Sequence, residues 1–170
     1  DPISVHVDTS IDEVAQTIGT DNKTVEKYID LLEKCYVIFR LNAFNRNLRT
    51  ELKKSKKIYF YDNGIRNAVI QNFAPLSLRQ DTGALWENFF ISERIKANHY
   101  NGNYAKSFFW RTTQQQEIDY IEEADGNFTA FEMKWNPNKR QITFPSPFLN
   151  NYPVKETVVI TPENYLEWVM

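Results

Sequence analysis

The chain has 170 residues, 42% hydrophobic and 25% charged, with a formal net charge of −2. This composition is typical of a globular protein, and the negative charge argues against strong non-specific binding to nucleic acid. No stretch approaches the roughly 18 apolar residues of a membrane span, and the single cysteine excludes a disulfide framework. We therefore expect a cytoplasmic protein without a membrane segment. Because residue 1 is Asp rather than Met, we expect a piece of a longer protein.

Two short helices joined by a tight turn are predicted near the N-terminus. Ser10 opens a capping-box pattern, apolar residues follow at helical spacing, and Gly19 is typical of a helix C-terminus. A second helix is predicted from Asp21 or Asn22 to about residue 34. Cys35 continues its apolar stripe, so we expect this side chain to be buried. Two helices in this arrangement indicate a helix-turn-helix.

Strongly basic sequence separates two β-rich segments, 37–41 and 57–61. Residues 45–57 carry six basic side chains against one acid, a local charge of +5. The arrangement resembles a winged helix-turn-helix, in which this stretch would be the wing and DNA the partner. The expected phosphate contacts are Lys53, Lys54, Lys56 and Lys57. The second helix is a weaker candidate, because three acidic side chains on it repel phosphate. Packing of this module against another domain or a partner chain is an equally open alternative.

A long apolar helix is predicted from Gly83 to about Asn98, after a connecting loop at 72–82. Apolar residues cover much of its circumference, so we expect it to be buried on several sides. Glu87 lies within this apolar segment, and a buried carboxylate without a partner is costly. Glu87 therefore either reaches the surface or faces a site that contains cations.

Three strands are predicted in the second half of the chain: 107–111, 117–122 and 128–135. Asp125-Gly126 favours a two-residue type I′ turn between the last two, so that paired residue numbers sum to 251. Asp119 then lies opposite Glu132, and Glu117 opposite Lys134, all on one face of the sheet. Opposed Cβ atoms are about 4.5–5.5 Å apart, so the carboxylates of Asp119 and Glu132 repel each other.

A divalent cation would relieve this repulsion, because hard ions such as Mg²⁺ or Mn²⁺ bind carboxylate oxygens. Asp119 and Glu132 are the predicted ligands, and Glu87 completes the set. Lys134 would orient a water molecule or stabilise charge on a phosphate, and the group would hydrolyse phosphodiester bonds. Arg111 ends the preceding strand and either contacts phosphate or pairs with a local acid. An ordinary sheet face carrying ion pairs is the alternative interpretation.

Glu87, Asp119 and the sequence Glu132-Met133-Lys134 resemble the PD-(D/E)xK nuclease superfamily, in which a helix Glu, a strand Asp and a Glu-x-Lys converge on metal. The proline that often precedes the Asp is replaced by Ile118. A narrower resemblance, to the C-terminal region of prokaryotic AAA+-type ATPases of the DUF4143 family, rests on five segments: 57–64, 83–89, 109–112, 117–120 and 131–135. It implies an N-terminal AAA+ ATPase domain as partner, although no P-loop pattern occurs in these residues.

The expected fold class is α+β, with a winged helix-turn-helix at 1–71 and a mixed-sheet, restriction-endonuclease-like PD-(D/E)xK domain at 72–170. The leading function is Mg²⁺-dependent cleavage of DNA. The rival is a non-catalytic DNA- or partner-binding region that regulates an attached ATPase and carries a vestigial site. A third possibility is a structural assembly module. The sequence leaves the oligomeric state open.

Overall fold

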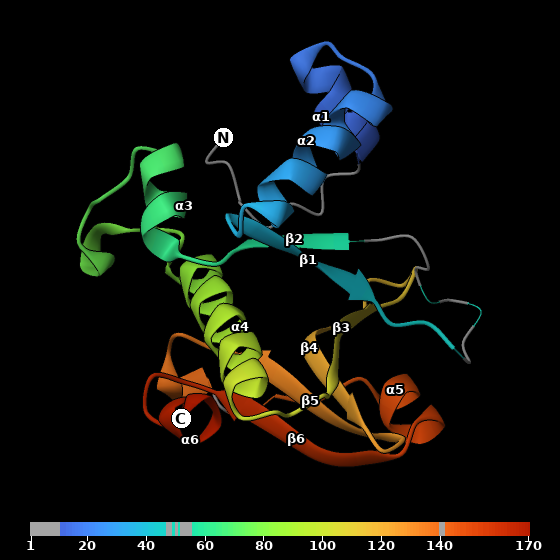
Figure 1. Ribbon diagram of the computed structural model, residues 1–170. Helices are drawn as coiled ribbons and strands as arrows, with labels where there is room; N and C mark the ends of the chain where they lie inside the picture. The colour runs from blue at the N-terminus through green and yellow to red at the C-terminus, as the bar shows by residue number, and fades with distance from the viewer. Residues whose placement is uncertain (1–10, 47–48, 50, 52–55, 140–141) are drawn as a thin grey trace.

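The computed structural model describes residues 11–46, 49, 51, 56–139 and 142–170. Its centre is a six-stranded mixed sheet with the strand order β2-β1-β3-β4-β5-β6 (Figure 1). The mixed α+β class predicted from the sequence is confirmed. The strands are β1 (Ile38–Ala43), β2 (Lys56–Phe60), β3 (Lys106–Arg111), β4 (Glu117–Ala124), β5 (Asn127–Met133) and β6 (Val154–Ile160).

The two N-terminal helices are α1 (Ile11–Ile18) and α2 (Asn22–Lys34), as the sequence pattern predicts. Gly19 adopts a left-handed φ of +69°, and Asp21 caps α2 by accepting a hydrogen bond from the Thr24 amide. Ser10, the expected cap of α1, lies outside the described residues. The prediction that Cys35 is buried is wrong. The apolar stripe of α2 is buried at Val25 but exposed at Leu31 and Leu32, nearer to Cys35. Helical periodicity identifies such a stripe, but it does not show whether another element packs on it.

The hairpin of β1 and β2 is part of the main sheet. β1 pairs antiparallel with β2 and parallel with β3, where Asn42 lies opposite Phe108. Glu51, which follows β1, is buried and accepts hydrogen bonds from Trp110 Nε1 at 2.7 Å and from Tyr152. The sheet therefore contains strands from both sides of residue 71, and the division at that residue stays a prediction.

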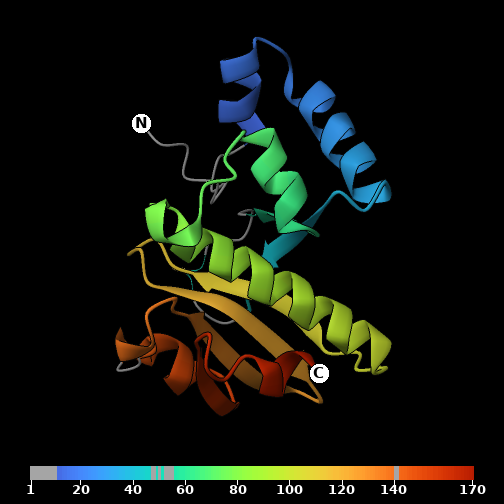
Figure 2. The same ribbon diagram turned by 90° about the vertical axis from the view of Figure 1, so that its left-hand side faces the viewer.

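A helical segment links the hairpin to the long central helix. It contains α3 (Asn63–Val69) and a short 3-10 turn, η1 (Leu76–Leu78), and leads into α4 (Thr82–Tyr100). Asp81 immediately precedes α4 and binds the buried guanidinium groups of both Arg66 and Arg79. These contacts join the start of α4 to α3 and to the residue after η1, and α4 then runs across one face of the sheet (Figure 2).

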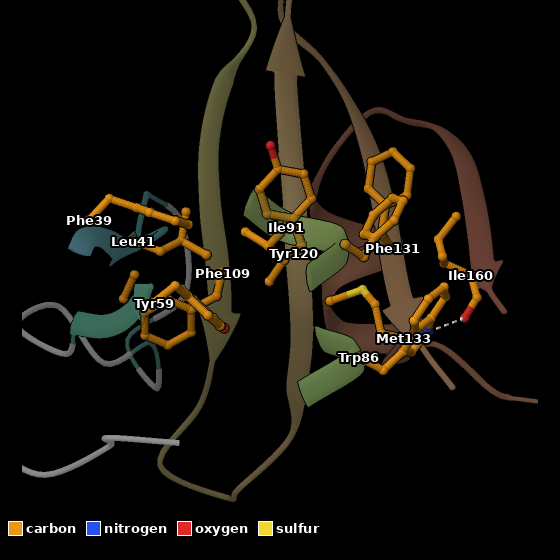
Figure 3. Close-up of a cluster of buried hydrophobic side chains, with 12 residues drawn as sticks. Phe39, Leu41, Tyr59, Trp86, Ile91, Phe109, Tyr120, Phe131, Met133 and Ile160 are labelled. Atoms are coloured by element: carbon orange, nitrogen blue, oxygen red, sulfur yellow. Dashed lines mark hydrogen bonds between the residues drawn. The ribbon is translucent and has the colours of Figure 1, made fainter. Parts of the chain in front are cut away.

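Two apolar clusters fill the opposite faces of the sheet. The larger one lies between the sheet and α4, and Figure 3 shows its aromatic side chains, among them Tyr59, Phe109 and Phe131. The indole of Trp86 on α4 also donates a hydrogen bond to the Ile160 carbonyl. The second cluster is closed by α5 (Ser146–Asn151). With both faces covered, polar side chains at the strand ends are held in fixed positions.

The C-terminal segment completes the fold. A 3-10 turn, η2 (Pro137–Lys139), follows β5, and α6 (Leu166–Val169) packs against α4 after β6. Among the described helices, none combines the length and the apolar character needed to cross a bilayer.

Candidate functional site

The β4–β5 hairpin has the predicted turn and register. Asp125 and Gly126 both have positive φ, 51° and 78°, as a type I′ turn requires. The pairs run from Ala124–Asn127 to Tyr120–Phe131 and keep the predicted sum of 251. The same register extended by one step places Asp119 opposite Glu132, at the end of the ladder.

Strict alternation along β4 fails, however, because this strand contains a β-bulge. Phe108 pairs with Ile121 and Trp110 with Ile118, so two steps on β3 span three on β4. Ile118 and Ile121 consequently both belong to the cluster under α5. The prediction that alternation alone places Glu117, Asp119, Glu132 and Lys134 on one face is therefore wrong. A bulge re-aims neighbouring side chains, and here it lies at Asp119.

Glu87 on α4 is buried and faces a cation rather than the surface. Its Oε1 accepts a hydrogen bond from the Tyr59 hydroxyl at 2.6 Å and lies 3.3 Å from the Lys57 ammonium nitrogen. Both donors come from β2. The helix acid of the site is thus held by the N-terminal hairpin, a contact between segments about 30 residues apart in sequence.

Lys57 does not belong with the wing lysines, and its assignment as a phosphate contact is corrected. It is 5% exposed and forms ion pairs with both Glu87 and Glu117. Burial alone lowers the pKa of Lys57, but the surrounding carboxylates, Glu87 foremost, outweigh burial and raise that pKa above its usual value. Alternation along β2 turns Lys57 inward and leaves Lys56 exposed. Lys53 and Lys54 lie outside the described residues.

Asp119 lies among like charges. One of its oxygens accepts a hydrogen bond from the Met133 amide at 3.1 Å, beyond the last paired residues of β4 and β5. Burial raises the pKa of the Asp119 carboxyl well above its usual value, and repulsion from Glu87 and Glu132 raises it further. Lys57 opposes this shift without cancelling it. The charges of Glu87 on α4 and Glu132 on β5 therefore both act on Asp119 of β4.

Lys134 lies at the same place, directly after β5. Its ammonium nitrogen is 3.2 Å from Oε2 of Glu132, and about a third of the side chain is exposed. Burial lowers the pKa of Lys134, whereas Glu132 and Asp119 raise it, and the net shift is upward. Lys134 is thus a charged, partly accessible donor beside the acids.

Arg111 ends β3 and pairs with Glu117, with 3.4 Å between Nε and Oε2. This contact favours the pairing of Arg111 with a local acid over a free phosphate contact. Glu117 is therefore engaged by Arg111 and Lys57. Lys134, predicted to lie opposite Glu117, pairs with Glu132 instead.

The donor set suits a hard divalent cation chemically, because Glu87, Asp119 and Glu132 offer carboxylate oxygens that repel one another. Within the described ranges, no three His, Cys, Asp or Glu side chains form a ready-made group of metal ligands. Ammonium groups contact the acids instead, Lys57 at Glu87 and Lys134 at Glu132. A metal would therefore have to displace or share these contacts.

Comparison with known proteins assigns the C-terminal half of the chain to a protein family. Residues 82–168 match the family described as "Domain of unknown function (DUF4143)". The chain belongs to the DUF4143 family. Residues 5–76 match a second description, "Domain of unknown function (DUF8612)". No solved structure is significantly similar to the chain.

Relatives of this DUF4143 chain occur in bacteria and in a virus. Uncharacterized proteins of Mycobacterium bovis and Mycobacterium tuberculosis are each 24% identical to it over 91% of the chain. An uncharacterized Bro-N domain-containing protein of Acanthamoeba polyphaga mimivirus is 29% identical over 66% of the chain and 56% of its own length. The chain spans 38% of the length of the mycobacterial relatives.

Sequence reasoning missed the part that β2 plays in the site. Alternation in Lys57-Ile58-Tyr59 places the lysine and the tyrosine on one face of the strand, and Tyr59 has the character of a core residue. This signal indicates that Lys57 points inward. The net charge over 45–57 does not show the inward position of Lys57, because a sum of charges does not distinguish buried side chains from exposed ones.

Proposed function

We propose that this chain is the C-terminal part of an AAA+-type ATPase and that its acidic site hydrolyses phosphodiester bonds of DNA with Mg²⁺ or Mn²⁺. One observation carries the proposal: Lys134 pairs with Glu132 next to the contact between Asp119 and the Met133 amide, and the charges of Glu87 and Asp119 also act on Lys134. In this proposal the sheet with α4 is a PD-(D/E)xK nuclease-like domain. The helices α1 and α2 with the β1–β2 hairpin form a winged helix-turn-helix.

Each residue has a distinct task in this reaction. Asp119 and Glu132 would hold the ion, with Glu87 completing the set. A bound Mg²⁺ would polarise the phosphate and lower the pKa of a water molecule. Lys134 would donate to the attacking water or to a phosphate oxygen, where positive charge stabilises the transition state. Its partial exposure supports this role, because a substrate can reach it.

A second candidate function has support in one observation. Lys57 already forms an ion pair with Glu87, which is the kind of contact a vestigial site would keep for stability. The chain would then be a non-catalytic DNA- or partner-binding region that regulates an attached ATPase. The mycobacterial relatives are long enough to contain such a further domain, since the chain covers 38% of their length.

Metal titration distinguishes these functions without knowledge of the DNA sequence. We expect millimolar Mg²⁺ or Mn²⁺ to raise the melting temperature of the wild type by mass action, with matching calorimetric binding. Glu132→Gln keeps the shape but removes a ligand charge, so it should abolish this effect. Without metal it should be as stable as the wild type or slightly more so, because the repulsion with Asp119 is reduced.

The matched control is Glu156→Gln, which changes an exposed glutamate on β6 and should leave metal binding intact. Incubation with DNA and Mn²⁺ then tests for cleavage. A wild type that ignores both ions, together with a destabilised Glu132→Gln, would identify Glu132 as a structural partner of Lys134 and favour the regulatory function.

A further inference from the structure

We propose that Lys57 is a built-in counter-ion of the acidic site that competes with divalent cations for Glu87, so that the β1–β2 hairpin sets the metal affinity. This inference rests on the metal site proposed above. It assigns a role to a residue from the N-terminal half of the chain that is not one of the metal ligands.

The position of Lys57 is enclosed. Its ammonium nitrogen lies 3.3 Å from Oε1 of Glu87, forms a second ion pair with Glu117, and lies 5.4 Å from the centre of the Phe109 ring. The side chain is only 6% exposed. Water therefore screens these charges little, and the attraction between Lys57 and Glu87 is strong.

The same Glu87 oxygen also accepts the hydrogen bond of the Tyr59 hydroxyl. An oxygen with two donors has little remaining capacity for a metal ion. Mg²⁺ binds carboxylate oxygens at about 2.0–2.1 Å, closer than the ammonium group lies, and two cations on one carboxylate repel each other. Binding of a divalent ion at Oε1 consequently requires Lys57 to withdraw, and an ion at the other oxygen of Glu87 is still repelled by the Lys57 charge.

Glu117 gives Lys57 a place to withdraw to. Because Lys57 pairs with Glu87 and Glu117 at once, it can leave the first and remain neutralised by the second. Its charge then stays inside the protein without an isolated buried ammonium group. The pair of glutamates thus allows exchange between a metal-free and a metal-bound arrangement.

Lys57 and Lys134 differ in how easily each can leave the glutamate with which it pairs. The side chain of Lys134 is 35% exposed and can leave Glu132 for water at small cost, whereas Lys57 is confined between α4 and β4. Lys134 should therefore present a weak barrier to the metal, and Lys57 a strong one. The residue that opposes metal binding most strongly, Lys57, therefore comes from β2 of the N-terminal hairpin.

The test measures Mn²⁺ affinity by calorimetric titration and by the melting temperature with and without Mn²⁺. Lys57→Met keeps an unbranched side chain that is one atom shorter and removes its charge. We expect it to bind Mn²⁺ about tenfold or more tightly than the wild type, since a like charge within 4–6 Å commonly shifts ionic equilibria by that amount. Without metal its melting temperature should fall, and Mn²⁺ should raise it further than in the wild type. Lys155→Met, a matched change at an exposed lysine of β6, should resemble the wild type.

A double variant keeps the test informative if Lys57→Met does not fold. Lys57→Met with Glu117→Gln removes one charge of each sign, so it should be more stable without metal than Lys57→Met and show the same gain in Mn²⁺ affinity. A wild type that binds Mn²⁺ as tightly as both variants, or more tightly, overturns the role of Lys57 and leaves the metal site standing. Absence of Mn²⁺ binding in every variant overturns both. Tighter binding in the variants without DNA cleavage supports the role of Lys57 and rejects the hydrolase.

Discussion

The hydroxyl group of Tyr59 donates a hydrogen bond of 2.6 Å to Oε1 of Glu87 and so joins the N-terminal hairpin to the central helix. Tyr59 is buried and stacks on Phe39. Burial and the charge of Glu87 raise the pKa of the Tyr59 hydroxyl well above its usual value, so this group stays protonated and remains a donor. The helix acid of the site is therefore oriented by a strand that precedes it by 28 residues.

Tyr59→Phe tests this relationship. The substitution keeps the ring in the core but removes a hydrogen bond to a buried carboxylate, which is worth about 1.5–3 kcal/mol. We expect a loss of that size in the free energy of unfolding measured with urea. Tyr104→Phe, at a tyrosine that is 94% exposed, should change it by less than about 0.5 kcal/mol. A Tyr59→Phe protein as stable as the wild type would show that Glu87 is held without this donor.

Local patterns in the sequence were sufficient for much of the fold. Asp125-Gly126 determines both the type I′ turn and the register that follows from it, because a two-residue loop leaves no freedom in pairing. The end of α1 follows from Gly19, and the start of α2 follows from Asp21, whose side chain accepts a hydrogen bond from the first turn. These features depend on neighbours within a few residues.

Features that depend on distant partners could not be predicted in this way. The bulge at Asp119 arises from pairing of β4 with β3, and the inward position of Lys57 depends on Glu87 and Glu117. The exposure of Cys35 has the same origin, since an apolar stripe does not say which surface covers it. Spacing in the sequence predicts the acids of the proposed site, but it does not indicate the lysine that pairs with Glu87.

The buried position of Lys57 leaves three lysines of the basic stretch as candidates for DNA binding. We predict that changing Lys53, Lys54 and Lys56 together to Gln lowers DNA affinity. The slope of log affinity against log salt concentration should become shallower by about 0.9 for each phosphate that these lysines neutralise in the wild type. Lys57 stays unchanged, because its removal would disturb the acidic site. Binding curves at several salt concentrations measure both effects.

A second variant for the same measurement carries Lys23→Gln and Lys27→Gln on α2. The case for α2 is stronger in the structure than in the sequence, because Arg40 pairs with both Asp30 and Glu33 and offsets one of their two negative charges. A larger drop in affinity from the α2 changes would place the DNA contact on that helix. Wild-type protein without any salt-dependent binding would favour docking of this module on a protein partner.

Asp81 should control stability in acid. Hydrogen bonds from Arg79, and then from Arg66, hold the pKa of Asp81 far below its usual value. Such a group stabilises the fold at pH values above its unfolded pKa of about 3.9 and loses this contribution as the pH falls toward the folded pKa. We expect Asp81→Asn to cost about 3 kcal/mol at pH 7, because Arg66 is left buried with its partner's charge removed.

The difference between wild type and Asp81→Asn should then narrow below about pH 4, because the Asp81 carboxyl takes up a proton in the unfolded wild type while it stays ionised in the folded protein. Urea unfolding from pH 7 to pH 2 measures the free energy of both proteins. Asp125→Asn, in the exposed β4–β5 turn where Asn is well tolerated, should follow the wild type at every pH. If the difference in free energy of unfolding stays constant across this pH range, the charge of Asp81 does not contribute to stability through Arg66 and Arg79.

Lys134→Met should separate metal binding from catalysis. Lys134 contacts Glu132 but is partly exposed, so its removal should change Mn²⁺ affinity by less than about fivefold, as for a surface ion pair. Cleavage of DNA should fall by at least about a hundredfold, because a donor to the attacking water or to the phosphate is removed. Titration calorimetry and single-turnover cleavage on the same preparations measure the two quantities, with Lys155→Met as the matched control. A Lys134→Met protein that cleaves DNA normally would exclude this lysine from catalysis, and one that no longer binds Mn²⁺ would make it part of the framework that holds Glu132.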